Sequence, residues 1–570
     1  MTLGKKLLLG CVALLSLSMG ALYLIPLETY LPQLEKFASK QFKTPVKIQS
    51  ISLAALPLPH LKLHQVQLGA AAAGIHAETI AVSFDFKALM AGKKEVREIR
   101  AEHLTVHYAE FRKLLTQMGK PSGKPIVTLR EFQASDVTLI LPWLTLADVA
   151  TKVSFAGDGK LEKIWVTLDK QHLSATLLPQ PQRHFAMQVD AKGWTTPLYP
   201  RFVWDELHLE GVVGEGDVVA TQLTAKMGDI HLAGTGRAEF AQRLQVSAQL
   251  DQLDAPIEQV LKLFDQSLLA TGNVHLSGKL QGEAETVAEL KQRVQFVGEL
   301  SGKQLQIPVA TDQPGVLLDE LHAQVLAGAA LLDLSVLDVT LYGGKITGLA
   351  QWSGLDQTLN ANIVLDAIEM QPLVAALTNR VVLSGKLAGK GNLAMQLNTP
   401  MPFPANSLLE GDFQLKEGKL SQVDLVKAAQ VAKTKQETTP SDGTEFDQFT
   451  GEFKVENGVY HFNKLDLSSG VLRAQGRMSV LPDKRISGGL DAYLKGTLGL
   501  VSVPLVISGT TDQPQVNPSG AFLAGAALGT ALMPGVGTVI GMKIGGLLNK
   551  IFGDDEIPLA KSAVSAVPSP

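Results

Sequence analysis

Two pairs of histidines have a spacing that could hold a metal ion. His60 and His64, and likewise His103 and His107, lie four residues apart, so on a helix both rings of a pair would share one face. Both pairs, however, fall in segments whose apolar residues alternate with polar ones, which is the pattern of a β-strand. Four residues of a strand span about 13 Å, which is too far for one ion. We therefore expect surface histidines and no metal site.

The sequence also lacks the motifs of common catalytic and nucleotide-binding sites. It contains no G-x-S-x-G, no Walker A loop and no H-E-x-x-H. The pairs Gly92-Lys93, Gly278-Lys279 and Gly385-Lys386 are not followed by Ser or Thr, and we expect them in hairpin turns. Cys11 is the only cysteine, so the rest of the chain has neither disulfide nor thiol chemistry. We predict a protein that is not an enzyme and uses no cofactor.

The composition favours a chain rich in aliphatic surface. Hydrophobic residues make up 45% of the 570 residues but aromatic residues only 6%, so most apolar side chains are Leu, Val, Ala and Ile. Lys and Arg number 51 against 55 Asp and Glu, which gives a net charge of −4. A nucleic-acid-binding protein would carry a basic surface, and we therefore expect no nucleic-acid partner.

An apolar segment near the N-terminus predicts a membrane anchor. The segment from Leu7 to Ile25 is uncharged and long enough, at about 1.5 Å per residue, to cross a hydrocarbon core. Lys5 and Lys6 precede it, so we expect the N-terminus to stay in the cytoplasm and the rest of the chain to be exported. In a bacterium this means an anchor in the inner membrane and a periplasmic location for the bulk of the chain. A cleaved signal peptide would be shorter and would end in small residues, so we favour an uncleaved, single-pass anchor.

Behind this segment the pattern predicts one helix and then many strands. Leu31, Leu34, Phe37, Ala38 and Phe42 recur at helical spacing and predict a short amphipathic helix. Further on, apolar residues alternate with polar ones between turn-forming Gly, Asp and Asn residues, which is typical of hairpin-connected strands. Such strands are expected around 46–48, 61–63, 104–108, 137–139, 246–250, 332–336, 393–397 and 453–455. Further short helices are expected only at 84–90, 256–264, 372–377 and 423–433.

These strands lack an obvious cover for their apolar face. A sheet buries that face against helices, a second sheet or itself, and few helices are predicted here. We expect the face to bind lipid acyl chains or to enclose an apolar interior, and both a lipid groove and an ordinary closed core satisfy the pattern. Alternation selects these groove-lining candidates: Leu104, Val106, Val137, Leu139, Val246, Leu250, Leu334, Val336, Leu393, Met395 and Leu397.

The chain also contains an internal repeat. Residues 276–282, LSGKLQG, return as 383–389, LSGKLAG, after a period of roughly 110 residues. Each copy is preceded by a similar Leu-Asp lead-in and a Pro that opens a short helix, at residues 250–257 and 365–373. Repeats that stack on their neighbours build elongated folds.

Four stretches, spread over both ends and the middle of the chain, carry a resemblance to a known family. The stretches are Pro45-Val46-Lys47-Ile48 with Pro57-Leu58-Pro59-His60-Leu61, then Leu341-Tyr342-Gly343-Gly344-Lys345-Ile346, then Phe446-Asp447-Gln448-Phe449-Thr450-Gly451, and finally Val503-Pro504-Leu505-Val506-Ile507. By their order and spacing the chain resembles the AsmA family of bacterial envelope proteins.

The resemblance implies a mainly β fold: an N-terminal transmembrane helix, then an elongated, twisted antiparallel β-sheet curled into a trough, with a few short helices. It also implies a part in moving phospholipid between the two membranes and in outer-membrane protein assembly. We accordingly expect a membrane anchor at 1–26, a chorein-like module at 27–150, a repeated β-meander trough at 151–400, an AsmA-like β region at 401–518, a glycine-rich apolar segment at 519–553 and a disordered tail at 554–570.

Two functions from different classes remain open at this point. In the first, the trough carries or shields phospholipid acyl chains, and phospholipids are the ligand. In the second, the sheet is a closed core and the chain is a structural or assembly factor whose partner is the outer-membrane assembly machinery. The inner membrane is a partner in both, through Leu7 to Ile25.

The glycine-rich segment near the C-terminus is a further candidate for membrane contact. Small residues spaced four apart let helices approach closely in a membrane. The candidates are Gly525, Gly529, Gly537, Gly541 and Gly545. The alternative is that this segment plugs the mouth of the trough.

Overall fold

The fold is mainly β and divides into two compact units. The computed structural model describes residues 27–54, 60–69, 74–85, 88, 95–108, 128–141, 145–197, 200, 202–240, 243–263, 270–308, 315–378, 380, 382–399, 401, 404–434, 443–495 and 502–524. Unit 1 comprises residues 1–255 and 277–294, and unit 2 comprises residues 256–276 and 295–570. The predicted anchor at residues 7–25 and the five predicted membrane-contact glycines lie outside the described residues. Within the described part, no helix has both the length and the apolar character that a membrane crossing needs.

In unit 1 the strands pair one after another in chain order. Each strand from the first to the thirteenth hydrogen-bonds to the next. The strands are β1 (Val46–Ala54), β2 (His60–Leu68), β3 (Ile75–Phe84), β4 (Glu95–His107), β5 (Thr128–Ile140), β6 (Thr145–Phe155), β7 (Leu161–Leu168), β8 (Leu173–Gln180), β9 (His184–Thr195), β10 (Val203–Val213), β11 (Asp217–Met227), β12 (Ile230–Glu239) and β13 (Leu244–Pro256).

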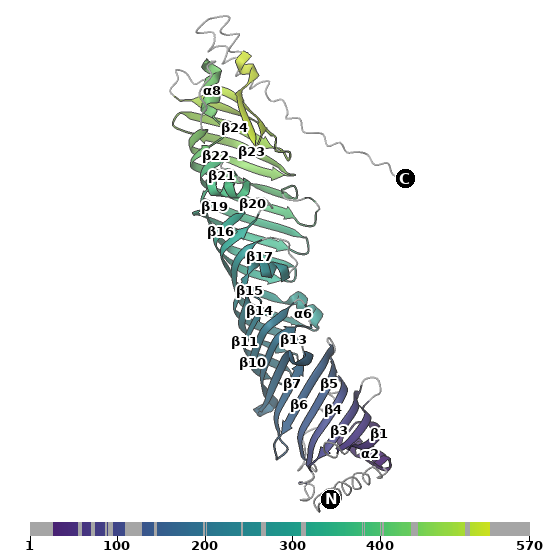
Figure 1. Ribbon diagram of the computed structural model, residues 1–570. Helices are drawn as coiled ribbons and strands as arrows, with labels where there is room; N and C mark the ends of the chain where they lie inside the picture. Colours follow the sequence, from purple (N-terminus) through teal and green to yellow (C-terminus); the bar gives the residue numbers. More distant parts are fainter. Residues whose placement is uncertain are drawn as a thin grey trace, which may run out of the picture. The chain divides into compact units, whose positions relative to one another are not determined.

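Unit 2 repeats this arrangement. Its strands again pair in chain order from β15 to β27, always antiparallel (Figure 1). They are β15 (Gln295–Ile307), β16 (Val316–Gly328), β17 (Leu331–Leu341), β18 (Gly344–Ser353), β19 (Thr358–Glu369), β20 (Leu383–Gln396), β21 (Ser407–Leu420), β22 (Thr444–Glu456), β23 (Val459–Ser468), β24 (Leu472–Val480), β25 (Ile486–Leu494), β26 (Ser502–Thr510) and β27 (Gln513–Pro518). β14 (Thr271–Ala284) carries residues of both units.

The helices of the described residues are few and short. The amphipathic helix predicted from Leu31 to Phe42 is confirmed as α2 (Leu31–Phe42). The others are the 3-10 turns η1 (Leu27–Tyr30), η2 (Asp169–Gln171) and η3 (Pro181–Arg183) and the helices α5 (Ile257–Leu263), α6 (Val287–Arg293), α7 (Met370–Thr378) and α8 (Leu425–Thr434). Three of these, α5, α7 and α8, fall where short helices were predicted.

The helix α6 was not predicted, although its start carries a sequence signal. Thr286 caps the helix: the Glu289 N–H donates to Thr286 Oγ1 (3.2 Å), while Glu289 Oε2 accepts from the N–H of Glu285 (3.2 Å), the residue before the cap. The signal is the T-x-x-E spacing. The helix itself has only seven residues, which is too short for an apolar period to stand out.

The internal repeat is present in the structure. The first copy, 276–282, lies in β14 directly after α5, and the second, 383–389, lies in β20 after α7. Gly278 and Gly385 occupy the same position of the two copies, and both have a positive φ, +157° and +121°. The prediction that Gly278-Lys279 and Gly385-Lys386 form hairpin turns is therefore wrong. Both pairs lie inside strands, and Gly385 stands at a register shift between β20 and β21.

One strand pair departs from the predicted antiparallel order. β4 and β5 pair in parallel, with Ala101 beside Ala134 and Val106 beside Leu139. A parallel pair needs a connection of about a dozen residues or more, so that the chain can return to the same end of the sheet. Residues 108–127 provide that length. The sequence pattern does not report strand direction, because alternation is the same in both.

The outer edge of β1 is closed by side chains of α2. The Val46 N–H donates to Ser39 Oγ (2.9 Å) and the Ile48 N–H donates to Glu35 Oε1 (2.7 Å). Leu31, Leu34, Ala38 and Phe42 meanwhile pack on a cluster that includes Val46 and Ile48. An open strand edge is a template for pairing with another chain, and α2 removes that template here.

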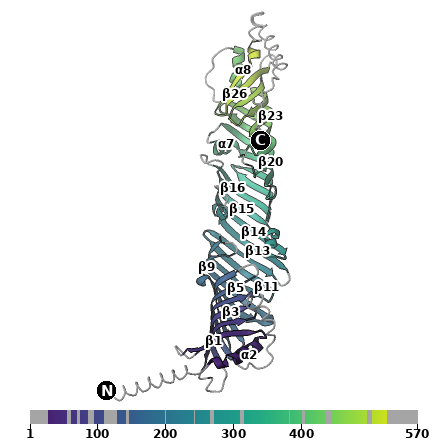
Figure 2. The ribbon, with the colours of Figure 1, turned by 90° about the vertical axis from the view of Figure 1, so that its right-hand side faces the viewer.

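At the other end of the described chain, α8 covers the last strands of unit 2. Leu425, Ala428 and Ala429 are buried in the main core cluster, and the helix contacts β25, β26 and β27. Its start is fixed by Asp424, whose Oδ1 accepts from the Lys427 N–H (2.7 Å). Figure 2 shows the second covering helix of unit 2, α7, near β20, which it contacts.

Candidate functional site

The pairing register of unit 1 assembles one continuous row of small and aliphatic side chains. Side chains at directly paired positions point to the same face of a sheet. The row crosses all thirteen strands and contains no ionisable residue. It runs Ile51, Leu63, Ile80, Ala101, Ala134, Thr151, Val166, Ala175, Val189, Leu209, Leu223, Gly234 and Leu250.

Unit 2 has a corresponding row from β15 to β25. It also lacks ionisable residues apart from the phenol of Tyr460, whose pKa is raised by burial. The row runs Gly298, Val325, Leu334, Ala350, Ala361, Leu393, Leu409, Val455, Tyr460, Val480 and Ile486. We call the face that carries each row the apolar face of its unit.

Much of each apolar face is only half-buried. In unit 2, Leu334, Ala350, Leu393 and Leu409 all keep part of their surface accessible, and in unit 1 Val189, Leu209, Leu223 and Leu250 do the same. A closed core would bury such side chains almost completely. Along these stretches the apolar face is therefore only partly covered by the rest of the protein.

Most of the predicted groove residues stand on these faces. Leu104, Val106, Val137 and Leu139 pack in one cluster on β4 and β5. Leu250 lies on the unit 1 row, and Val246 pairs with Ala238 on the same face. Leu334 and Leu393 share the unit 2 row, while Met395 pairs with Leu359 one step along. These placements fit a groove lining, and the lining role itself stays a prediction.

Two predicted residues sit differently. Val336 stands at a register shift between Leu334 and Leu337, has φ +51° and is 66% exposed. The extra residue interrupts the alternation, so Leu337 rather than Val336 continues the apolar face, where it packs on the core cluster. Leu397 follows the last residue of β20 and is exposed. Simple alternation cannot locate a bulge, which explains the difference at Val336.

The apolar face of unit 2 leads to a partly open cavity. A cavity of about 340 Å³ lies between the strands from β20 to β27 and the start of α8. Val480 and Ile486, the last two residues of the unit 2 row, line it. Its other walls are almost entirely apolar: Leu383, Leu420, Val423, Leu425, Phe449, Phe462, Leu465, Met478, Leu490, Ile507 and Val516. Sequence reasoning missed most of these residues, because no local pattern shows which strands curl toward each other.

Two of the residues that line the cavity, Phe449 and Phe462, belong to an aromatic cluster. Phe413 packs edge-on against Phe449 (centroids 5.3 Å apart) and Phe462 (6.5 Å). Gly451 pairs with Phe413 across the two strands, and a Cβ there would stand 2.7 Å from Leu465 Cδ2 and 2.8 Å from the Phe413 ring. Glycine is thus required at this position to let Phe413 and Leu465 pack above it.

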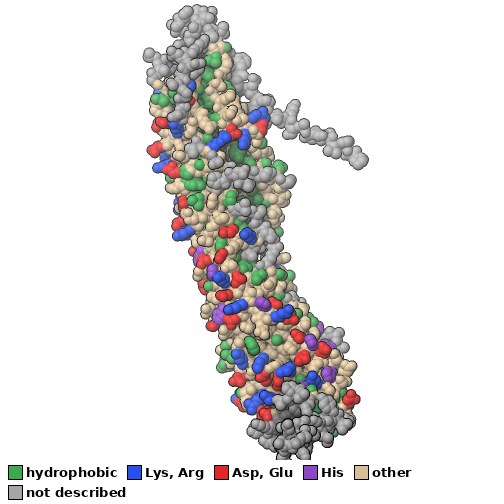
Figure 3. Space-filling model, viewed as in Figure 1, with side chains coloured by type: hydrophobic (Ala, Val, Ile, Leu, Met, Phe, Trp, Pro, Cys, Tyr) green, Lys and Arg blue, Asp and Glu red, His purple; other side chains and the backbone are tan. Residues whose placement is uncertain are grey.

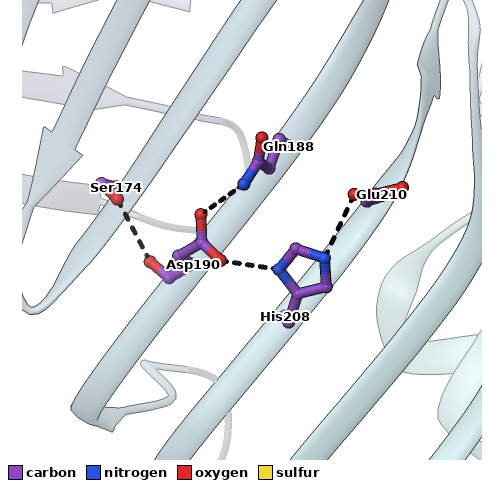
Figure 4. A network of polar contacts seen from close by, with 5 residues as sticks. All are labelled: Ser174, Gln188, Asp190, His208 and Glu210. Carbon is purple, nitrogen blue, oxygen red and sulfur yellow. Dashed lines mark hydrogen bonds and ion pairs between the residues drawn. The ribbon is translucent and has the colours of Figure 1, made fainter.

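The opposite face of each sheet carries charged and polar side chains together with some exposed aliphatic ones, among them Leu349 and Val364 in unit 2. Figure 3 shows Lys and Arg side chains beside Asp and Glu side chains over much of the visible surface. In unit 1, His208 is the centre of one such network (Figure 4): its Nδ1 lies 2.6 Å from Asp190 Oδ1 and its Nε2 3.4 Å from Glu210 Oε1. Gln188 Nε2 also donates to Asp190 (3.1 Å). The hydrogen bond to Asp190 raises the pKa of His208.

This network contains the parts of an acid–base pair but not the setting of an active site. It lies on the solvent-facing side of the sheet, and Ser174 reaches only the backbone oxygen of Asp190 (3.5 Å), not the imidazole. Among the described residues no group of three or more His, Cys, Asp or Glu side chains has the geometry to hold a metal ion. The face that differs from an ordinary protein surface is the apolar one.

In a comparison with known protein families, one family matches the part of unit 2 that carries Leu334 and Leu393. The model of the AsmA family matches residues 299–465. This part of the chain is an AsmA-family domain. It spans nearly the whole of β15 to β23 and thus most of the unit 2 row. No curated protein matches the chain significantly. The match includes residues 341–346 and 446–451, which carried the resemblance in the sequence. It points to an envelope protein that is linked to outer-membrane biogenesis.

Proposed function

We propose that this protein binds phospholipid acyl chains along its apolar faces and carries or shields them between the membranes of the bacterial cell envelope, and so contributes to outer-membrane biogenesis. One observation carries the proposal. The unit 2 row keeps apolar, half-buried side chains at paired positions across strand after strand, and it ends in an apolar cavity. The AsmA-family match over residues 299–465 supports it.

The physical advantage of such a face is continuity. Each methylene that stays out of water is worth about 0.8 kcal/mol, so an acyl chain does not cross an aqueous compartment unaided. Neighbouring strands lie about 4.8 Å apart, so a chain in contact with Leu334 can pass to Ala350 and Ala361 without leaving apolar surface. A curled, trough-like sheet would then hold the acyl chain inside while the headgroup stays in water.

The rest of the proposal concerns location. The segment from Leu7 to Ile25 would anchor the chain in the inner membrane with the bulk of it in the periplasm. The outer membrane or its assembly machinery would be the partner at the other side of that compartment. Gly525, Gly529, Gly537, Gly541 and Gly545 would contact a membrane there.

The experiment is lipid analysis of the purified full chain with a matched pair of variants. Leu334 and Ser335 are neighbours on β17, Leu334 on the apolar face and Ser335 on the exposed one. Mass spectrometry should find phospholipid bound to the wild type and to Ser335→Asp, and much less bound to Leu334→Asp, because a carboxylate on the apolar face would be desolvated by the acyl chain. A folded wild type without lipid would refute the proposal and favour a non-lipid assembly factor.

A further inference from the structure

An ion pair between segments far apart in sequence lies beside residues that line the unit 2 cavity, and we take this place as the mouth of the cavity. Arg380 Nη1 lies 2.8 Å from Asp512 Oδ1. Arg380 comes two residues before Val382, which lines one wall, and Asp512 follows Thr511, which lines the facing wall. The pair therefore joins the segment before β20 to the turn between β26 and β27.

The turn that carries Asp512 is fixed by its own hydrogen bonds. The Thr511 N–H donates to the carbonyl oxygen of Lys484 (2.9 Å), and the Gln513 N–H donates to Thr510 Oγ1 (3.2 Å). These bonds hold the turn beside the cavity without help from the ion pair. Loss of the Arg380–Asp512 contact would thus leave the wall in place.

The ion pair itself is exposed and exchangeable. The side chains of Arg380 and Asp512 are 50% and 49% exposed, and pairs of that exposure contribute little to stability. An arginine guanidinium, in contrast, matches the geometry of a phosphate group and binds it through two parallel N–H donors. Arg380 can therefore exchange Asp512 for a phosphate that reaches the mouth.

The cavity behind the pair is suited to an acyl chain. Of its lining side chains only Gln422 and Thr511 are polar, and none is charged. Its volume of about 340 Å³ falls at the lower end of the range of about 300–1,000 Å³ for small-molecule sites, which fits one chain better than two. An apolar space with a cation beside it is complementary to an anionic amphiphile.

We propose that this cavity binds one acyl chain of an anionic phospholipid, with the lipid phosphate on Arg380 in place of Asp512. The inference rests on the proposed function, because it names a defined resting site for the lipid that the apolar face conducts. Asp512 acts as a competitor that holds Arg380 when the cavity is empty and repels a phosphate that approaches. The site thus selects for an anionic headgroup.

The test measures binding of two lipids that differ only in the phosphate. The full chain, purified in a non-ionic detergent, is titrated with a tail-labelled phosphatidylglycerol and with a diacylglycerol that carries the same labelled tail. Arg380→Gln should weaken phosphatidylglycerol binding roughly ten-fold and leave diacylglycerol binding unchanged. Asp512→Asn should tighten phosphatidylglycerol binding several-fold, an outcome that a misfolded variant would not produce. Arg183→Gln, which breaks an exposed ion pair with Glu215 in unit 1, serves as the control and should change neither.

A photocrosslinker then localises the bound lipid. Met478 lines the cavity, while its neighbour Ser479 faces the other way and contacts His461 (3.0 Å). A lipid adduct at position 478 and none at 479 is expected. If both lipids bind but Arg380→Gln affects neither, or affects both equally, the inference is wrong and the proposed function stands. If the full chain binds neither lipid, the proposed function itself fails.

Discussion

Leu334 on β17 and Leu393 on β20 lie on one row of the same sheet face, linked through the paired residues Ala350 and Ala361. The connection is made entirely by strand register, because no loop or helix intervenes. A change at one position of the row therefore alters the same surface that the others form. This relationship yields predictions that separate a lipid-binding face from a closed core.

The first prediction concerns a charge on the row. Leu393→Lys places an ammonium group on the apolar face, whereas Ala394→Lys places it on the exposed face of the same strand. We expect Leu393→Lys to lose bound phospholipid but to remain folded, because its half-buried site lets the long side chain reach water. Ala394→Lys should keep both. Lipid content by mass spectrometry and circular dichroism would measure the two properties, and an unfolded Leu393→Lys beside a normal Ala394→Lys would indicate a closed core.

The second prediction concerns the glycine beneath the aromatic rings. Gly451→Ala should destabilise unit 2 by about 1–3 kcal/mol, because the added methyl group would collide with Leu465 and Phe413. Gly391→Ala is the matched variant, because the Cβ added there would stand 3.5 Å from Ile363 Cγ1, the side-chain atom nearest to it. Chemical unfolding would compare them. Equal stability of the two variants would contradict the packing described here.

The third prediction concerns the closed edge of β1. Glu35→Ala removes the acceptor for the Ile48 N–H and should cost about 1–2 kcal/mol. The same change should speed hydrogen exchange at Ile48 and promote self-association through the exposed strand edge. Lys36→Ala, one residue along α2 on its exposed side, should do neither. Unchanged exchange at Ile48 in Glu35→Ala would show that the carboxylate does not protect this edge.

The fourth prediction concerns pH. Because the folded chain raises the pKa of His208 through its hydrogen bond to Asp190, the imidazolium is favoured in the folded state. Its contribution to stability is fully present below the unfolded pKa of about 6.5 and is lost as the pH rises through the higher folded value. His208→Gln should remove that part of the pH dependence.

The control for this effect is His231→Gln, because the His231 ring contacts the backbone oxygen of Asp229 rather than a carboxylate. Unfolding midpoints in denaturant, measured from pH 5 to pH 9, would compare the two variants with the wild type. If His208→Gln keeps the pH profile of the wild type, the network in Figure 4 does not contribute to stability.

Much of this fold follows from local pattern alone. Alternation located strands at residues 104–106, 137–139 and 393–395 and selected the side chains that share a face, because the two-residue period of a strand is independent of its neighbours. The helix from Leu31 to Phe42 followed in the same way from its apolar stripe. These features need no knowledge of the rest of the chain.

The features that were missed depend on distant residues. The bulge at Val336 is defined by the pairing of β17 with β18, and the parallel direction is a property of β4 and β5 together. The contact between Arg380 and Asp512 joins residues that no periodicity relates. The cavity is likewise a property of eight strands together. Local sequence thus specifies which face is apolar, while long-range pairing decides where that face forms a cavity.

The most direct test of the central claim is photocrosslinking in living cells along β17 and β20. A photoreactive residue is placed in turn at the apolar-face positions Leu334, Leu393 and Met395 and at their outward neighbours Ser335 and Ala394, and lipid adducts are detected by mass spectrometry. The account predicts adducts at the three apolar-face positions and none at the two neighbours. Folded, abundant protein without adducts at any position would show that the face is a closed core and would contradict the account.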